Sequence, residues 1–123
     1  MISFDDFKME PGIPIYLQIV LFIKRGIVAG IIKRGDELPS RRILSALLGV
    51  NPNTVQKAYK MLEDEFLIES HSGAKSEVSF SRDKITSLRQ ELIGNDTKLI
   101  ITSMKQMGLT KEEAVSLIEK LWE

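Results

Sequence analysis

The feature that most constrains the fold is a pair of short helical segments separated by a very brief connection. The first segment begins after Ser40, a good N-cap residue, and Gly49 stands where a left-handed C-cap is needed. The second segment opens with Asn51 as N-cap and Pro52 at the first helical position. Two helices joined by a turn of about four residues around a glycine have helix-turn-helix spacing. The pattern therefore predicts a helix-turn-helix.

The second of these helices has one apolar face and one polar face. Apolar residues recur at intervals of three and four, namely Val55, Ala58, Tyr59 and Leu62. The opposite face carries polar and charged residues, namely Asn53, Thr54, Gln56, Lys57 and Lys60. We expect the apolar stripe to join the core and the polar face to point away from it.

Further elements are expected on both sides of this pair. An irregular arm over residues 1–13 precedes a helix over residues 14–29, which is apolar on more than one face. This helix is either covered on two sides or carries an exposed patch for a partner. Two extended stretches over residues 67–71 and 77–80 enclose a turn that contains Gly73. They predict a β-hairpin directly after the second short helix, in the position of a wing.

The segment after the wing has a helical pattern. Its near-heptad spacing is interrupted at Gly94-Asn95-Asp96, and Gly108 stops this helix. Thr110 and Glu113 then form a capping box for a last amphipathic helix. The predicted fold is mainly α with a small β-hairpin. Its two parts are a winged helix-turn-helix DNA-binding domain over residues 1–80 and a helical dimerisation tail over residues 81–123.

The charged residues are unevenly distributed, although the formal net charge is zero. The segment from Lys24 to Lys60 holds eight basic residues against only two acidic ones, Asp36 and Glu37. A basic segment is the electrostatic footprint of a nucleic-acid-binding surface, and a solvated surface that happens to be basic is the alternative. The acidic run over residues 63–65 is interpreted as a solvated helix end.

Several other classes of function find no support in the sequence. There are no cysteines and one histidine, so His71 is interpreted as a strand-end residue rather than a metal ligand. Without a glycine-rich phosphate loop or a nucleophile–base pair, the chain is predicted to be no enzyme and to need no cofactor. The chain has no signal-peptide pattern, and no apolar run reaches the roughly 18 residues of a membrane span. A cytoplasmic location without membrane contact is therefore expected.

The polar side chains of the helix-turn-helix suit contacts with double-stranded DNA. The N-terminal end of the second helix usually enters the major groove, and here it carries Asn53, Thr54, Gln56 and Lys57. Asn and Gln pair with adenine, and Thr contacts a thymine methyl group or a phosphate. Arg41 and Arg42 begin the preceding helix, where they are placed to contact phosphates, and Lys60 lies within reach of a phosphate but too far along for bases. Ser40 and Asn51 are capping residues first.

Two stretches resemble the GntR family of transcription regulators. They are residues 35–44, GDELPSRRIL, and residues 48–59, LGVNPNTVQKAY. The run Val-Asn-Pro-Asn-Thr-Val, the Pro-Ile-Tyr at residues 14–16 and the short helical tail resemble the YtrA subfamily in particular. This resemblance implies a repressor of an operon that often encodes ABC transporter components. It also implies that the DNA-facing positions are Ser40, Arg42, Asn53, Thr54, Gln56, Lys57 and Gly73.

The chain departs from the family pattern at and near the wing. The family usually has Gly-x-Gly-x-Phe-Val there, whereas residues 73–78 of this chain read GAKSEV, in which Lys75 is placed to reach a phosphate. Phe66 stands where the family prefers glycine, and Leu47 stands where a polar residue is usual. An alternative function is therefore kept: a winged-helix protein-interaction module that does not read DNA.

The tail is predicted to join two copies of the chain. One recognition helix buries too little surface for tight operator binding, whereas a two-fold dimer doubles the contact and matches a palindromic site. The tail helices are alternatively a cover for the apolar flank of the first helix, and we expect both roles. No residue marks a small-molecule effector site, so an effector is left open. The candidate dimerisation residues are Ile85, Leu88, Leu92, Leu99, Ile100, Met104, Leu117, Leu121 and Trp122.

Overall fold

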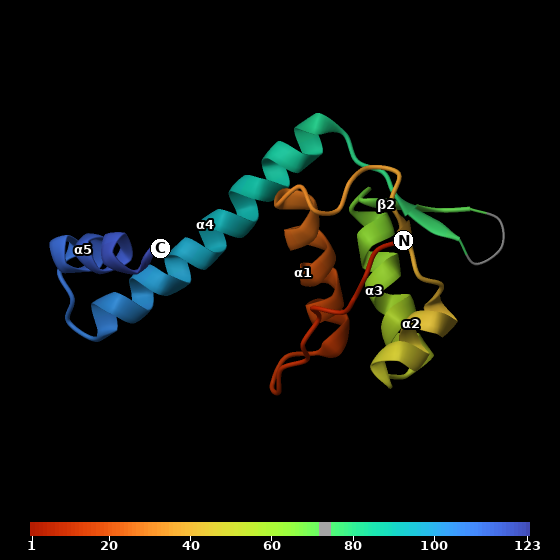
Figure 1. The fold of residues 1–123 in the computed structure, drawn as a ribbon, viewed down its shortest axis with the longest axis horizontal. Helices are drawn as coiled ribbons and strands as arrows, with labels where there is room; N and C mark the ends of the chain where they lie inside the picture. Colours follow the sequence, from red (N-terminus) through yellow and green to blue (C-terminus); the bar gives the residue numbers. More distant parts are fainter. Residues whose placement is uncertain (72–74) are drawn as a thin grey trace. The chain divides into compact units, whose positions relative to one another are not determined.

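The computed structural model describes residues 1–71 and 75–123, which form two compact units, Met1–Leu88 and Arg89–Glu123. Mainly helical structure with a small sheet confirms the predicted fold class. No helix in the described ranges is long and apolar enough to cross a membrane. The elements, labelled in part in Figure 1, are α1 (Ile15–Val28), β1 (Glu37–Leu38), α2 (Arg41–Leu48), α3 (Pro52–Asp64), β2 (Ile68–Ser70), β3 (Ser76–Val78), α4 (Arg82–Gln106) and α5 (Lys111–Leu121).

The first unit packs three helices beside a three-stranded antiparallel sheet. Helix α3 contacts both α1 and α2, and the three helices are grouped together in Figure 1. The strand order is β1-β3-β2, so the predicted hairpin of β2 and β3 is confirmed and β1 is an additional strand. In this register Glu77 of β3 lies between Glu37 of β1 and Glu69 of β2.

The core of this unit is formed by the apolar faces that the helical spacing predicts. All four residues of the predicted α3 stripe are fully buried, as are three isoleucines of α1. Lys24 is the charged residue of this interior, and its Nζ lies 2.8 Å from Glu65 Oε1 at the end of α3. The core residues of α1, α2 and α3 include Ile19, Ile23, Ile27, Leu44, Val55, Ala58, Tyr59 and Leu62.

The caps that define the two short helices are formed as predicted. The Ser40 hydroxyl accepts a hydrogen bond from the Ile43 N–H at 3.2 Å, which begins α2. Gly49 ends α2 in the left-handed conformation with φ 67°. The Asn51 side chain then accepts from the Asn53 N–H at 2.8 Å, with Pro52 as the first residue of α3. These local signals therefore fix the length of the turn between the helices.

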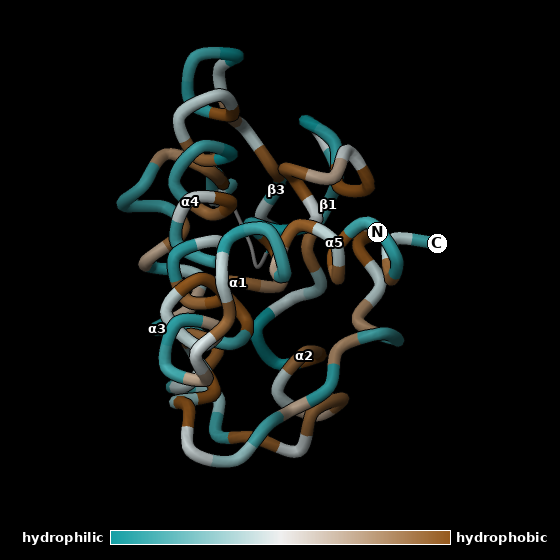
Figure 2. Tube along the Cα trace, turned by 90° about the vertical axis from the view of Figure 1, so that its left-hand side faces the viewer, coloured by the Kyte–Doolittle hydropathy of each residue, from teal (hydrophilic) through white to brown (hydrophobic). Residues whose placement is uncertain are grey.

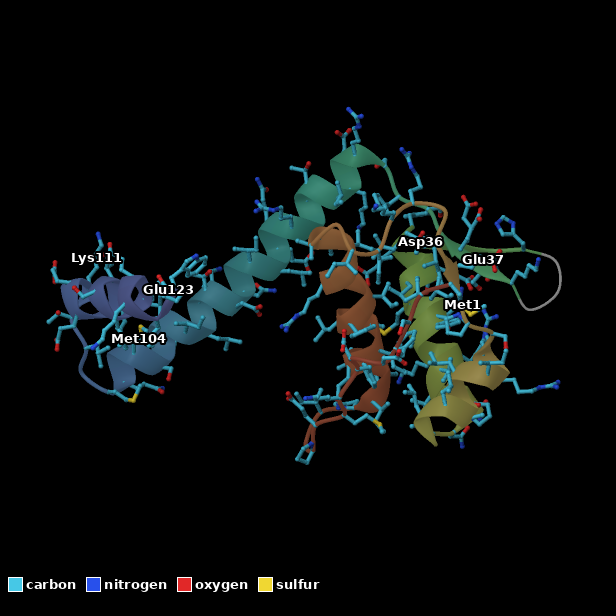
Figure 3. The ribbon with its side chains drawn as sticks, viewed as in Figure 1. Met1, Asp36, Glu37, Met104, Lys111 and Glu123 are labelled. Atoms are coloured by element: carbon cyan, nitrogen blue, oxygen red, sulfur yellow. The ribbon has the colours of Figure 1, made fainter. Side chains whose placement is uncertain are left out.

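The N-terminal arm has no helix or strand, as predicted, but it packs against the first unit. Ile2 and Phe4 are buried, and the Ile2 N–H donates to the Glu37 carbonyl oxygen at 2.7 Å. Figure 3 labels Met1 and Glu37, which lie in the same region of the molecule. The Phe4 ring stacks on Phe22 of α1 with 4.9 Å between ring centroids. The arm therefore covers the outer edge of β1, which would otherwise be an open sheet edge.

Helix α4 is one continuous helix through Gly94, although the near-heptad spacing is interrupted there. A helical glycine costs about 1 kcal/mol relative to alanine, and hydrogen bonds in the turns on both sides offset this cost because helix formation is cooperative. Gly108 has φ 80° and follows the end of α4. The predicted capping box is confirmed: Glu113 N–H donates to Thr110 Oγ1 at 3.1 Å, and Thr110 N–H donates to Glu113 Oε1 at 3.0 Å.

Helix α5 contains no buried residue in the single chain. Hydrophobic residues nevertheless recur among hydrophilic ones along α4 and α5 (Figure 2). A small hollow of this unit is lined by Met104 of α4 together with apolar residues of α5 and its end, namely Leu117, Ile118, Leu121 and Trp122. The second unit therefore exposes apolar side chains that a stable soluble helix would bury.

Candidate nucleic-acid interface

The face of α3 that points away from the core carries the polar residues that the sequence places there. Asn53, Gln56 and Lys57 are exposed, and Thr54 is half-buried. All four belong to the first two turns of α3, which is the part of a recognition helix that normally meets base edges. The structure therefore presents amide, hydroxyl and ammonium groups together on one convex surface.

Helix α3 is held against the beginning of α2 by a buried hydrogen bond. The Tyr59 hydroxyl donates to the Pro39 carbonyl oxygen at 2.6 Å. Pro39 directly precedes the Ser40 cap, so this bond connects the middle of α3 to the start of α2. Burial raises the pKa of Tyr59 above its ordinary value, an effect that the positive charge of Arg41 partly opposes. The two helices of the motif are thus fixed relative to each other by a specific polar contact as well as by packing.

The two arginines at the start of α2 have different environments. Arg42 is exposed, and among the described residues it has no ion-pair partner. Arg41 instead directs its Nη2 to Glu63 Oε1 at 3.1 Å, and its guanidinium lies over the Tyr59 ring at 5.3 Å from the centroid. The Nε of Arg41 is buried without a hydrogen-bond partner. Arg42 is therefore the better placed of the two for a phosphate contact.

The acidic run at the end of α3 is not simply solvated, which corrects the sequence interpretation. Glu63 pairs with Arg41, Asp64 pairs with Lys60 at 2.9 Å, and Glu65 pairs with Lys24 at 2.8 Å. Each partner belongs to the basic segment identified in the sequence. The pairings of Glu63 and Glu65 join residues 22 and 41 positions apart, so local patterning gave no signal for them, whereas Lys60–Asp64 is an i,i+4 pair within α3. They leave fewer unpaired cations on this surface than the sequence suggests.

Two lysines of α3 are oriented by neighbouring side chains. Lys57 Nζ lies 4.0 Å from the centroid of the Tyr16 ring of α1, a cation–π contact that positions the ammonium group near the start of α3. Lys60 lies one turn further along, and its hydrogen bond to Asp64 raises the pKa of Lys60, with a smaller contribution from the Asp64 charge. Lys57 therefore faces the surface that also carries Gln56, whereas Lys60 is engaged within α3.

The wing is described in part. Lys75 is exposed, and Gly73 lies outside the described residues. Phe66, between α3 and β2, has φ 60° and a side chain that is 78% exposed. It is the one described residue other than glycine in the left-handed region, which L side chains rarely adopt. The position that is glycine in the GntR pattern thus keeps a glycine-like backbone in this chain.

The candidate dimerisation residues fall into three groups by their exposure. Leu88 is 2% exposed within the first unit, so its apolar character is already explained without a second copy. Ile85, Leu92 and Met104 are half-buried. The remaining candidates are exposed large apolar residues, namely Leu99, Ile100, Leu117, Leu121 and Trp122.

Together these features define a winged helix-turn-helix: a capped pair of short helices, an exposed polar face on the second of them, an exposed arginine at the start of the first, and a hairpin immediately after the pair. This is a class of DNA-binding module. The chain gives independent evidence of its family through comparison with known proteins. The protein-family model described as "Bacterial regulatory proteins, gntR family" matches residues 15–78 of this chain.

Relatives match over most of their length. The HTH-type transcriptional repressor YtrA of Bacillus subtilis is 37% identical over 110 residues, which cover 89% of this chain and 80% of that protein. A solved GntR family regulator from Listeria monocytogenes has a TM-score of 0.81 and 33% identity, covering 92% and 99% of the two chains. YtrA from Sulfolobus acidocaldarius, a GntR-family transcription factor, has a TM-score of 0.55 and 34% identity, covering 94% and 93%.

This chain belongs to the GntR family of bacterial transcription regulators, and within it to the YtrA subfamily. Its members are DNA-binding regulators and not enzymes. The sequence resemblance is therefore confirmed.

Proposed function

We propose that this protein is a homodimeric repressor that binds a palindromic operator through the exposed face of α3. The observation that carries the proposal is the grouping of Asn53, Gln56 and Lys57 on one exposed face of α3, together with an exposed Arg42 at the start of α2 that has no ion-pair partner among the described residues. Amide side chains supply base readout, and the cations supply attraction to the phosphate backbone. The similarity to a B. subtilis protein named as a transcriptional repressor supports repression as the sign of regulation.

The proposal extends to the roles of individual residues. Gln56 and Asn53 read base edges, Thr54 and Lys57 contact bases or backbone, and Arg42 anchors a phosphate. The Arg41 guanidinium is held by Glu63, so its contribution to phosphate binding is smaller. Lys75 of the wing, Ser40 and Lys60 add further backbone contacts. The target proposed from the subfamily resemblance is an operon that encodes ABC transporter components.

The tail of one chain pairs with the tail of a second copy in this proposal. Exposed apolar residues on α4 and α5 support this, because an 11-residue helix without buried side chains is not stable by itself in water. A two-fold pair of winged units matches a palindromic site and doubles the phosphate contacts.

The test is fluorescence anisotropy of the protein with duplex DNA from its own upstream region, across a salt series. Wild-type binding is expected to weaken steeply with salt, because each phosphate contact releases counterions. Arg42→Ala should weaken binding on all sequences and lower the salt slope by about one, whereas the matched variant Arg41→Ala should change the slope less. Gln56→Ala should relax sequence preference by about 1–3 kcal/mol at one base pair in each half-site.

A negative result in the same DNA-binding test would exclude the proposal. Wild-type protein that binds its upstream DNA no better than random duplex, and that enriches no sequence from a random library, would exclude operator binding. The alternative of a winged-helix protein-interaction module would then replace the proposal.

A further inference from the structure

We propose that Glu69, His71 and Glu77 form a binding site for a divalent transition-metal ion, with zinc as the representative ion, on the outer face of the wing. The three side chains come from β2, the residue that follows β2, and β3. One ligand atom from each lies within 4.8 Å of the other two. His71 Nε2 and Glu77 Oε1 are already 2.9 Å apart. Glu69 is two residues from His71 in the sequence, and the pairing of β2 with β3 adds Glu77 beside them.

The sheet register places an unusual row of like charges at this position. Glu37, Glu77 and Glu69 are direct neighbours across the three strands, so three carboxylates lie side by side. Like charges directly opposite each other destabilise a sheet. In the part of the chain that the structure describes, no lysine or arginine forms an ion pair with any of the three, and His71 is the group that contacts Glu77. A bound cation would remove this repulsion.

The residue types select the kind of metal ion. An imidazole nitrogen with two carboxylate oxygens suits zinc and its neighbours in the first transition row, whereas Ca²⁺ and Mg²⁺ prefer oxygen ligands alone. Zinc bonds of about 2.0–2.2 Å place tetrahedral ligand atoms about 3.3–3.6 Å apart. The His71–Glu77 pair, at 2.9 Å, is near this spacing, and the Glu69 carboxylate lies within 4.8 Å of both, so zinc binding requires it to move closer. Water completes the coordination because His71 and Glu77 are both partly exposed.

Metal binding would change the charge of the wing and hold β2 and β3 together. Three carboxylates repel DNA phosphates, and a divalent ion offsets two of these negative charges. Metal-bound protein should therefore bind its operator more tightly than metal-free protein. This consequence rests on the proposed DNA-binding function, whereas the metal site itself does not.

The site can be tested on untagged full-length protein by NMR, because His71 is the one histidine of the chain. Its imidazole nitrogens give one set of signals that need no further assignment. Titration with ZnCl₂ is expected to shift the Nε2 signal with one equivalent per chain, and millimolar MgCl₂ should not reverse the shift. Isothermal titration calorimetry on the same sample then measures affinity.

Three isosteric variants make the assignment specific. Glu69→Gln and Glu77→Gln each remove one ligand charge and should weaken zinc binding about tenfold or more. Glu37→Gln removes the same charge from the same row but no proposed ligand, so it should weaken binding by less than about threefold. Circular dichroism checks that each variant is folded. Zinc that leaves the His71 signals unchanged, or that binds Glu77→Gln as tightly as wild type, would overturn the site.

A parallel titration with operator DNA separates the two proposals. Tighter DNA binding with zinc in wild type, but not in Glu77→Gln, supports a regulatory role for the site. A DNA affinity that zinc does not change overturns that regulatory role. The NMR titration alone then decides whether the metal site exists. If the protein binds zinc at His71 but binds no DNA with or without zinc, the operator proposal is wrong and the metal site is retained.

Discussion

At the scale of single residues, Tyr59 connects the two helices that present the interface. Its hydroxyl is buried and donates at 2.6 Å to the Pro39 carbonyl oxygen. Tyr59→Phe keeps the ring but leaves this buried carbonyl without its donor, so the free energy of unfolding is expected to fall by about 1–3 kcal/mol. Urea denaturation measures the loss. Tyr16→Phe is the matched control, and an equal loss in that variant would contradict the assigned role.

The same hydroxyl predicts a pH dependence. Burial raises the pKa of Tyr59 in the folded protein above the value of about 10 that an unfolded tyrosine has. The unfolded state therefore loses this proton first, so the stabilisation by Tyr59 is complete below about pH 10 and declines as the pH rises beyond it. Denaturation midpoints at increasing pH should show the gap between wild type and Tyr59→Phe narrowing above pH 10. A gap that widens there would contradict the prediction.

Phe66 illustrates a backbone cost at one residue. A non-glycine residue in the left-handed region destabilises the folded state by roughly 1–2 kcal/mol. The Phe66 ring offsets little of this loss, because it is exposed rather than buried. Phe66→Gly is expected to stabilise the protein by about 1 kcal/mol, as measured by thermal unfolding. Phe66→Ala removes the ring and keeps the strained backbone, so it should give no comparable gain. Equal stabilisation by both variants would assign the effect to the ring instead.

At the scale of elements, two glycines within helices have opposite surroundings. A Cβ at position 94 of α4 meets no atom within 4 Å, whereas a Cβ at position 26 of α1 would overlap the Ile32 side chain. Gly94→Ala should therefore raise the free energy of unfolding by about 1 kcal/mol through helix propensity. Gly26→Ala should lower it by about 1–3 kcal/mol through overpacking. Denaturant titration of both variants checks the pair, and a change of the same sign in both would refute it.

The helices were predictable because their signals are local. Ser40, Asn51 and Thr110 each cap a helix through a bond to a residue two or three positions away, and the sequence shows both partners. The spacing of apolar residues likewise predicted which face of α3 would be exposed. Strand β1 was not predictable, because its two residues pair with β3 some 40 positions later. The interruption of the apolar spacing at Gly94 does not break α4, because cooperative helix formation outweighs one weak residue.

The sequence predicted which residues form the interface, but not the long-range contacts that position their side chains. Periodicity alone identified Asn53, Gln56 and Lys57 as an outward face. The distinction between Arg41 and Arg42 depends on Glu63, which is 22 residues from Arg41, so no local pattern contains it. Glu69 and Glu77 lie only two and six residues from His71, but the side chains come together through the register of β2 with β3, which the spacing of residues does not show.

At the scale of the whole molecule, the exposed apolar residues of the second unit predict self-association. Leu121 is 70% exposed and the single tryptophan, Trp122, is 82% exposed. Leu121→Glu places a charge in the proposed dimer contact and should shift the protein from dimer to monomer in sedimentation velocity. Leu47→Glu changes an equally exposed leucine of α2 and should leave the dimer intact. Wild-type protein should also show bluer Trp122 emission as its concentration rises through the dimer dissociation constant.

The arm that covers β1 affects the order in which parts of the fold can form during synthesis on the ribosome. Residues 2–4 are synthesised before everything they pack on, and Glu37 can join the sheet only after β3 has emerged, since Asp36 and Gly35 both bond to Val78. Helices α1 to α3 have their mutual contacts available earlier. Until Val78 leaves the exit tunnel, β1 of the nascent winged unit therefore has no partner strand, and residues 2–4 have α1 to pack on but not the completed sheet.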